Sequence, residues 1–162
     1  MLSEINNEPL PLSPELVKPA AETCGRAFID DPTTNYFIPD AARKPNLPSS
    51  FEYYLRLCLL SKGYEAYVAS PQCEGVAIWI RSGAKESLLA HLQAGWPLLP
   101  LRCGWRHIIR EAMADIRFSR LRRKLAPERH IYLGLLAVDP SCHGQGYASR
   151  LMHPMLARLD AE

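Results

Sequence analysis

The sequence predicts an α/β fold in which helices flank a mixed central sheet. The segment 131–138 is apolar or aromatic at every position except Gly134, as in a strand covered on both faces. From residue 144 onward, apolar residues recur at spacings of three and four, which indicates an amphipathic helix. Two further apolar segments, 64–69 and 75–80, precede this strand, and helical patterns come before them. At 162 residues, the chain has the length of a single domain.

The chain is predicted to begin irregularly and then to become helical. Residues 1–13 hold two prolines among polar residues, which favours an irregular lead-in. A helix follows and keeps one apolar face as far as Pro32. It starts after Ser13 or after Lys18, because each of these residues precedes a proline that suits the first helical turn.

A second helix and a hairpin are predicted next. A short apolar turn at 36–38 precedes helical spacing over 51–59, and Gly63 is a suitable residue to end that helix. The segments 64–69 and 75–80 are separated by a short polar stretch with a proline, so we expect an antiparallel hairpin.

The segment 84–126 separates this hairpin from the strand at 131–138. Its apolar residues follow mostly helical spacing, and Gly95, Pro100 and Gly104 divide it, so we expect a helical insertion. Basic residues concentrate at 117–124, which is typical of a solvated helix face. No nucleic-acid-reading module accompanies them, so we expect no nucleic-acid partner.

Glycines open the helix that follows the strand at 131–138. The first backbone N–H groups of a helix have no internal partner, and the helix dipole adds roughly half a positive charge there. Gly144 and Gly146 lack Cβ atoms, so a phosphate can approach these N–H groups closely. The strand, loop and helix together predict a site for a diphosphate.

Gly134 adds a second indication about the ligand. A glycine inside a strand often marks a bulge or a place where a ligand comes close. If the strand separates from its neighbour there, the backbone groups of Leu136, Ala137 and Val138 are free to pair with an extended, amide-bearing ligand. Pantetheine is such a ligand, and pantetheine joined to a diphosphate fits coenzyme A better than a nucleotide.

In these residues the sequence resembles the GNAT superfamily of N-acetyltransferases. In that family's acetyl-CoA motif, a strand ending in Val-x-Pro precedes Gln or Arg, two residues, Gly, one residue, and Gly or Ala. Here Val-Asp-Pro at 138–140 precedes His-Gly-Gln-Gly-Tyr-Ala at 143–148, and the resemblance covers residues 130–161. His143 departs from the family's Gln or Arg.

The resemblance implies a GNAT-like acyl-CoA N-acyltransferase fold. It also implies direct transfer of the acetyl group of acetyl-CoA, the cosubstrate, to a primary amine of a small molecule or peptide. In the family, further strands and a helix follow this motif, so we expect the C-terminal part of the fold to be missing after residue 162. An unpaired strand edge predicts pairing with a partner such as a second copy in a homodimer. The residues that the resemblance places at the cosubstrate are Leu136, Ala137, Val138, His143, Gly144, Gln145, Gly146, Tyr147, Ala148 and Ser149.

No catalytic acid or base is assigned from the sequence. A primary amine with a pKa near ~10.4 is almost wholly protonated at pH 7, so a base must take its proton. The resemblance implies that a backbone N–H near Ala137 or Val138 polarises the thioester. His130 and Tyr132 lie at the other end of this strand, where surface and packing roles explain them better than a proton relay. Cys142 lies near the positive helix end, but a thiol nucleophile is no part of the family's scheme.

Other nucleotide sites fit less well. No Gly-x-x-x-x-Gly-Lys-Ser/Thr run occurs, so the sequence holds no P-loop. Ser149 stands where a dinucleotide fingerprint needs Gly or Ala. A non-catalytic acyl-CoA-binding or regulatory module and a dinucleotide-binding oxidoreductase stay open as alternatives, and so does the acceptor, whether antibiotic, polyamine, amino acid or protein N-terminus.

The composition predicts an ordinary globular protein of the cytoplasm. A net charge of +2 gives no strong field for nucleic acid or a membrane. No apolar run reaches the ~18 residues of a membrane span, and the N-terminus lacks the features of a signal peptide. The 5 cysteines and 5 histidines show no metal-ligand spacing, so we expect reduced thiols and no metal.

Overall fold

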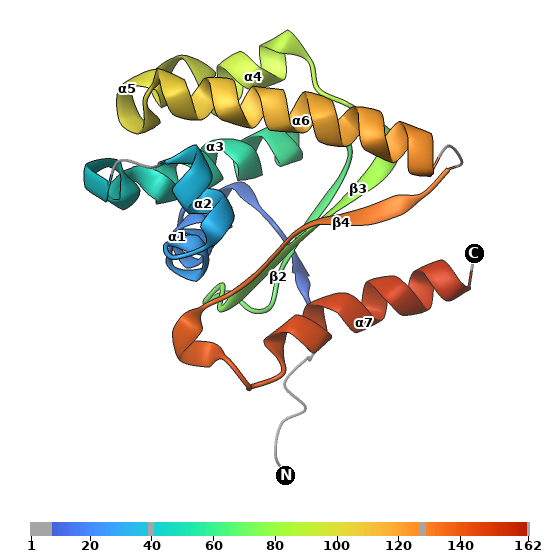
Figure 1. The fold of residues 1–162 in the computed structure, drawn as a ribbon. Coiled ribbons are helices and arrows are strands. Elements are labelled where there is room, and N and C mark those ends of the chain that lie inside the picture. The colour runs from blue at the N-terminus through green and yellow to red at the C-terminus, as the bar shows by residue number, and fades with distance from the viewer. Residues whose placement is uncertain (1–7, 39–40, 127–128, 162) are drawn as a thin grey trace.

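In the part of the chain that the structure describes, helices cover both faces of a four-stranded antiparallel sheet (Figure 1). This computed structural model describes residues 8–38, 41–126 and 129–161. The α/β class predicted from the sequence is confirmed. The strands lie in the order β1 (Leu10–Pro11), β2 (Lys62–Val68), β3 (Gly75–Lys85) and β4 (Ile131–Val138).

The described strands all pair antiparallel, whereas the sequence predicts a mixed sheet. A short turn joins β2 to β3, and a turn of this kind can connect only antiparallel neighbours. The long segment after β3 returns the chain to the same end of that strand, where Arg81 lies opposite Ile131. β4 therefore runs back along β3.

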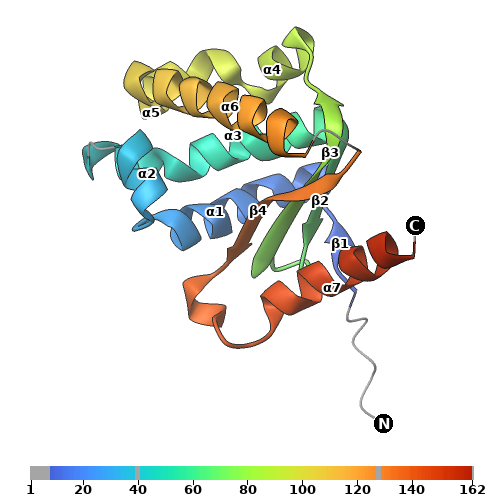
Figure 2. The same cartoon turned by 45° about the vertical axis from the view of Figure 1, so that its right-hand side comes forward.

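Apart from the short helix α2, which contacts α6, the described helices form three groups around this sheet. α1 and α3 cover one face of the sheet, and α7 covers the other (Figure 2). The group α4 to α6 lies beyond α3, farther from the sheet (Figure 1). None of the described helices is long and apolar enough to cross a membrane. The bounds are α1 (Val17–Phe28), α2 (Pro32–Phe37), α3 (Leu47–Leu60), α4 (Leu88–Ala94), α5 (Leu99–Cys103), α6 (Trp105–Leu125) and α7 (Tyr147–Asp160).

Strand β3 is buried on both faces and forms the centre of the core. Val76 and Ile78 are fully buried among the side chains of α1 and α3. Ala77 and Trp79 point the other way and pack with α7. This alternation follows from the two-residue period of a strand. Burying one large aliphatic side chain contributes about 1.5–3 kcal/mol, so β3 holds both helical layers in place.

Some boundaries differ from those that the sequence predicts. Leu10 and Pro11 pair with β2, so the predicted irregular lead-in includes a short edge strand, on which a proline is tolerated. Helix α3 ends at Leu60, before Gly63. Gly63 instead lies in β2 with a φ of 90°, where the register shifts between Lys62 and Tyr64. Its conformational freedom serves a bulge in the strand rather than the end of the helix.

The segment predicted as a helical insertion begins later than expected, because β3 continues to Lys85. Ser87 then caps α4, since its hydroxyl accepts the N–H of Ala90 at 3.1 Å. Gly95 and Gly104 follow the ends of α4 and α5 with φ values of 103° and 88°.

A one-residue bulge interrupts β4 at Gly134, as the sequence predicts. Ile78 lies opposite Leu135 and Trp79 lies opposite Leu133, so Gly134 is the extra residue. A Cβ at this position would lie 2.5 Å from Cδ1 of Ile80. Gly134 therefore lets the side chain of a core residue of β3 lie directly against the bulge.

Replacement of Gly25 by alanine tests the packing of α1 against α3. A Cβ at Gly25 would lie 2.6 Å from Cγ of Pro48, whose ring cannot rotate away. Alanine favours a helix interior by about 1 kcal/mol over glycine, but overpacking costs about 1–3 kcal/mol. We expect Gly25→Ala to lower the free energy of unfolding by about 1 kcal/mol in urea denaturation. Adding Pro48→Ala should recover this loss, and a more stable Gly25→Ala protein would refute the packing argument.

Candidate functional site

The loop between β4 and α7 takes backbone conformations that require glycine. Gly144 and Gly146 have φ values of 77° and 83°, in the left-handed region. Nothing lies within 4 Å of the position that a Cβ would take at either residue. Open space therefore surrounds both glycines, and their backbone is accessible to a ligand.

The N-terminus of α7 presents backbone donors that the helix does not use. The first bond of the helical series runs from the N–H of Arg150 to the carbonyl of Gly146, at 3.0 Å. The N–H groups of Tyr147, Ala148 and Ser149 precede it and so have no acceptor within the helix. No side chain caps this end in the described structure. The amides and the helix dipole create a positive potential suited to an anion.

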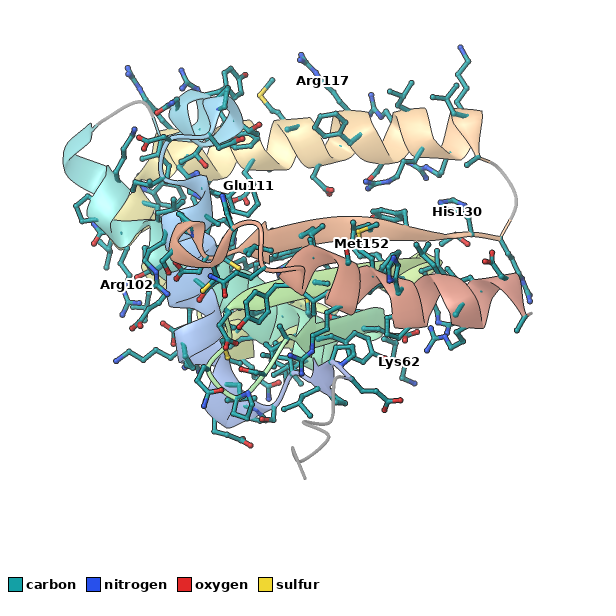
Figure 3. All side chains as sticks on the ribbon, turned by 90° about the horizontal axis from the view of Figure 1, so that it is seen from below. Lys62, Arg102, Glu111, Arg117, His130 and Met152 are labelled. Carbon is teal, nitrogen blue, oxygen red and sulfur yellow. The ribbon has the colours of Figure 1, made fainter. Side chains whose placement is uncertain are left out.

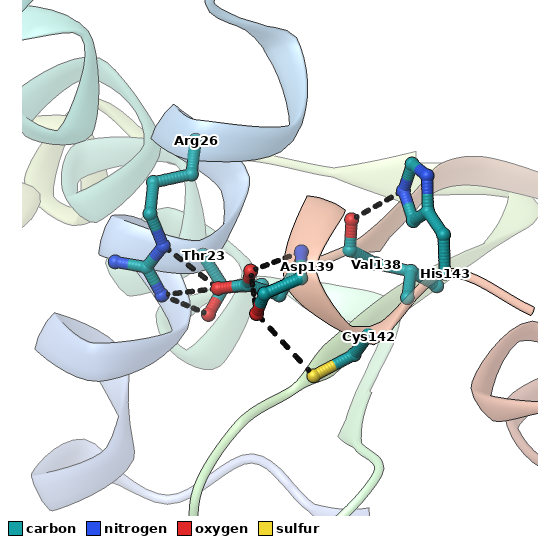
Figure 4. A network of polar contacts seen from close by, with 7 residues as sticks. Thr23, Arg26, Val138, Asp139, Cys142 and His143 are labelled. Atoms are coloured by element: carbon teal, nitrogen blue, oxygen red, sulfur yellow. Dashed lines mark hydrogen bonds and ion pairs between the residues drawn. The ribbon is translucent and has the colours of Figure 1, made fainter. Parts of the chain in front are cut away.

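Asp139 fixes the start of the loop (Figure 4). Its carboxylate accepts the N–H and the hydroxyl of Ser141, at 3.0 and 2.7 Å. Arg26 of α1 forms an ion pair with it at 2.7 Å and also donates to the Thr23 hydroxyl at 3.1 Å. The Ser141 hydroxyl and then the Arg26 guanidinium hold the pKa of Asp139 below its usual value. The loop is thus tied to the first helix.

Glu74, in the turn between β2 and β3, fixes the other side of the loop. Its carbonyl accepts the N–H of Asp139 at 2.8 Å. Its carboxylate accepts the hydroxyl of Tyr147, the first residue of α7, at 3.2 Å. The end of β4 and the start of α7 are therefore both held by a single turn.

The outer edge of β4 is not paired with another described strand, and its backbone groups alternate in direction. The N–H of Asp139 bonds to the carbonyl of Glu74, so the backbone groups of Asp139 point toward β3. Two residues earlier, the N–H and carbonyl of Ala137 point the same way, toward Val76. Those of Leu136 and Val138 therefore face the open edge. The sequence predicts free groups at all three residues, but Ala137 is paired within the sheet because β4 does not separate from β3 there.

His143, which replaces the Gln or Arg of the motif, reaches back to β4. Its Nε2 lies 3.2 Å from the carbonyl oxygen of Val138, an arrangement in which the ring N–H donates (Figure 4). Gln145 is also turned toward the loop, because its amide nitrogen lies 3.4 Å from the Ser141 carbonyl. Both side chains brace the loop, and the donors that stay accessible are those at the start of α7.

A cavity of about 530 Å³ lies beside the bulge in β4. Residues from the ends of α1 and α2, from α3, from α6 and from β4 line it. Its lining includes Leu136, one of the residues whose backbone groups face the open edge of β4. The cavity and the loop therefore meet along this strand. Its aromatic lining residues are Phe28, Phe37, Phe51 and Tyr54.

Three polar side chains come together in the cavity wall. The Ser50 hydroxyl of α3 lies 2.9 Å from Nε2 of His107. Nε2 of His107 also lies 3.4 Å from a carboxylate oxygen of Glu111, one turn along α6. His107 is only 4% exposed, and burial lowers its pKa, so the ring is neutral at pH 7. Its Nδ1 has no hydrogen-bond partner among the described residues.

Glu111 is the carboxylate in this group. It lies on the side of α6 that faces β4, whereas Arg117 points away (Figure 3). Loss of solvation in the cavity wall, and then the negative charge of Asp115, raise the pKa of Glu111 to about 7. Its side chain is 52% exposed, so water in the cavity tempers this shift. A carboxylate with a pKa near neutrality suits a general base.

The sequence predicts no base, although the His107–Glu111 spacing of four residues is visible on a predicted helix. It could not bring Ser50 to this pair, because the two segments are far apart in the chain. His130 and Tyr132 lie near the start of β4, at the opposite end from the loop. Arg122 stacks on the Tyr132 ring, 4.3 Å from its centroid, which agrees with a packing role. Cys142 is half-buried, 3.6 Å from the Ser141 hydroxyl.

The glycine loop and the N-terminus of α7 follow the bulged strand β4, which borders the cavity. A family model described as "Acetyltransferase (GNAT) family" matches residues 106–162, from α6 through β4 and the loop to α7. The match is consistent with a member of the GNAT superfamily. No curated protein matches the chain.

Replacement of Glu111 by glutamine tests its environment without substrate. A carboxyl whose pKa is raised in the folded state contributes stability below its unfolded pKa of about 4.3, which is lost as the pH rises through about 7. Glutamine cannot ionise. The free energy of unfolding of Glu111→Gln relative to the wild type should therefore be higher at pH 8 than at pH 4.5. Urea denaturation at both pH values measures the gain. If the free energies of unfolding of the variant and the wild type differ by the same amount at both pH values, the carboxyl titrates normally.

Proposed function

We propose that this protein is an N-acetyltransferase that transfers the acetyl group of acetyl-CoA directly to a primary amine. The observation that supports this proposal most strongly is that β4 connects a set of backbone donors with a cavity. The free amides at the start of α7 follow one end of the strand, and the cavity with Glu111 borders its bulge. An acyl group carried along the open edge of β4 would reach that cavity.

The backbone donors fit the two parts of coenzyme A. The N–H groups of Tyr147, Ala148 and Ser149 suit the diphosphate, because they are unpaired within the helix and the glycines leave them accessible. The groups of Leu136 and the N–H of Val138 suit the amides of pantetheine, because they face the open edge.

The chemistry of acetyl transfer needs a base and a donor to the oxyanion. In our proposal the acceptor ammonium gives a proton to Glu111, and the resulting amine attacks the thioester carbonyl. The C–N bond forms, the C–S bond breaks, and the thiolate of coenzyme A takes up the proton that the attacking nitrogen loses. The N–H of Val138 is a candidate donor to the oxyanion, since that of Ala137 is used in the sheet.

Acetyl-CoA binding is tested by Gly146→Asp. The carboxylate would place a negative charge where the diphosphate is expected, so we predict a loss of affinity of at least about tenfold in calorimetry. Gly83→Asp is a matched control, because Gly83 has a φ of 82°, equally open surroundings and a position in β3 far from the loop. Equal affinity in the two variants would contradict the proposed site. Binding without thiol release from any amine would identify a non-catalytic acyl-CoA-binding module instead.

The pH dependence of kcat/KM tests Glu111 as the base. In the wild type, kcat/KM should rise about tenfold per pH unit below about 7 and then level off, because the reaction needs ionised Glu111 and the acceptor ammonium. In Glu111→Gln only free amine reacts, so the rise should continue toward the amine pKa of ~10.4. At pH 8 we expect the variant to be roughly 100-fold slower. A plateau above pH 7 in the variant would remove Glu111 from the mechanism.

A further inference from the structure

The cavity beside β4 is walled mainly by apolar side chains from several elements. Phe28 of α1 and Phe51 of α3 stack with ring centroids 5.5 Å apart. Phe37 of α2 and Tyr54 of α3 add two more rings, and Leu133 adds an aliphatic group from β4. Such walls favour a flat apolar group, because aromatic pairs gain from edge and offset contacts beyond the area they bury.

The described lining residues of this cavity carry little charge. Among the described residues, none that lines this cavity is a lysine or an arginine, and the carboxylates that line it are Asp31 and Glu111. Asp31 caps α2 by accepting the N–H groups of Thr33 and Thr34, at 2.7 and 3.3 Å. Glu111 forms no ion pair with a lysine or arginine among the described residues. It is therefore the carboxylate available to a bound cation.

A second cavity, at the other end of β4, has the opposite character. It is lined by Arg81, Arg122 and Arg123 together with Glu86 and Asp115. A polycationic or zwitterionic acceptor would find countercharges there. In the cavity with Glu111, a second charge on the acceptor would lose its hydration against phenyl rings, and Asp31, which already caps α2, is the only other described carboxylate in the lining. The two cavities therefore favour different ligands. The cavity that Leu136 borders favours an acceptor with a single positive charge.

We propose that the acceptor is a primary amine with one aromatic or comparably apolar substituent. Its ring lies against the stacked pair of Phe28 and Phe51 and against Tyr54, and its ammonium lies at Glu111. The neutral, buried His107 and the Ser50 hydroxyl lie in the same wall, so Glu111 is the group there that pairs with the ammonium. The cavity volume of about 530 Å³ is in the usual range for a small-molecule site. This assignment rests on the proposed acetyl transfer.

The test compares amines in an assay for thiol release from acetyl-CoA. We expect kcat/KM for 2-phenylethylamine and tryptamine to exceed that for putrescine and lysine by about 100-fold. Phe51→Ala should reduce the value for 2-phenylethylamine by about tenfold or more, and Phe51→Leu by less. Phe118→Ala is the matched control, because Phe118 is exposed on α6 and does not line this cavity. A preference for putrescine, lysine or a peptide amine would overturn the assignment while leaving acetyl transfer intact.

Calorimetry with 2-phenylethylamine separates the two proposals. If no amine releases thiol, acetyl transfer fails, and binding alone decides the ligand class. Binding to the wild type that weakens at least about tenfold in Glu111→Gln and in Phe51→Ala would support the aromatic amine. Unfolding curves of both variants show whether they are folded. Absence of binding to the wild type, or equal binding by both variants, would overturn the assignment.

Discussion

The pairing of β4 with β3, shifted by one residue at Gly134, determines the geometry of the whole site. An antiparallel ladder turns alternate backbone groups outward, so the phase of the pairing decides which residues of β4 can bind a ligand. The hydrogen bond from the N–H of Asp139 to the carbonyl of Glu74 sets that phase near the loop. The backbone groups of Leu136 and Val138 therefore face the open edge. The bulge places Ile80 of β3 against β4 and borders the cavity. One register shift thus connects the core, the strand edge and the cavity.

The proposed anion site depends on this strand and on two contacts from distant segments. Arg26 of α1 holds Asp139, and Glu74 holds the hydroxyl of Tyr147. These contacts orient the start of α7 relative to the edge of β4. The donors themselves are backbone amides, whose positions follow from the left-handed conformations of Gly144 and Gly146. Such amides bind an anion without first giving up other partners, so little reorganisation is needed.

Local sequence predicted the parts of the molecule that local physics controls. The hairpin, the bulge at Gly134 and the glycine loop before α7 each follow from short patterns of apolar residues and glycines. The edge strand at Leu10 could not be predicted, because its pairing with β2 is a contact between distant segments. The group of Ser50, His107 and Glu111 could not be predicted either, because α3 and α6, which bring it together, are far apart in the sequence. Gly63 shows that a positive φ suits a bulge as well as a helix end.

Helix α6 explains why the site residues were the hardest part to predict. Its polar residues His107, Glu111 and Asp115 recur every four positions and line the cavities, while Trp105, Ile109 and Met113 are exposed. An amphipathic helix is expected to turn its apolar face inward, so the usual pattern predicts the wrong orientation here. The reversal is possible because α6 covers cavities rather than a packed core, and His107 is its only residue that is buried among those described. A helix that turns polar groups toward a cavity contributes little to packing, and in the proposed reaction its inner face supplies the base.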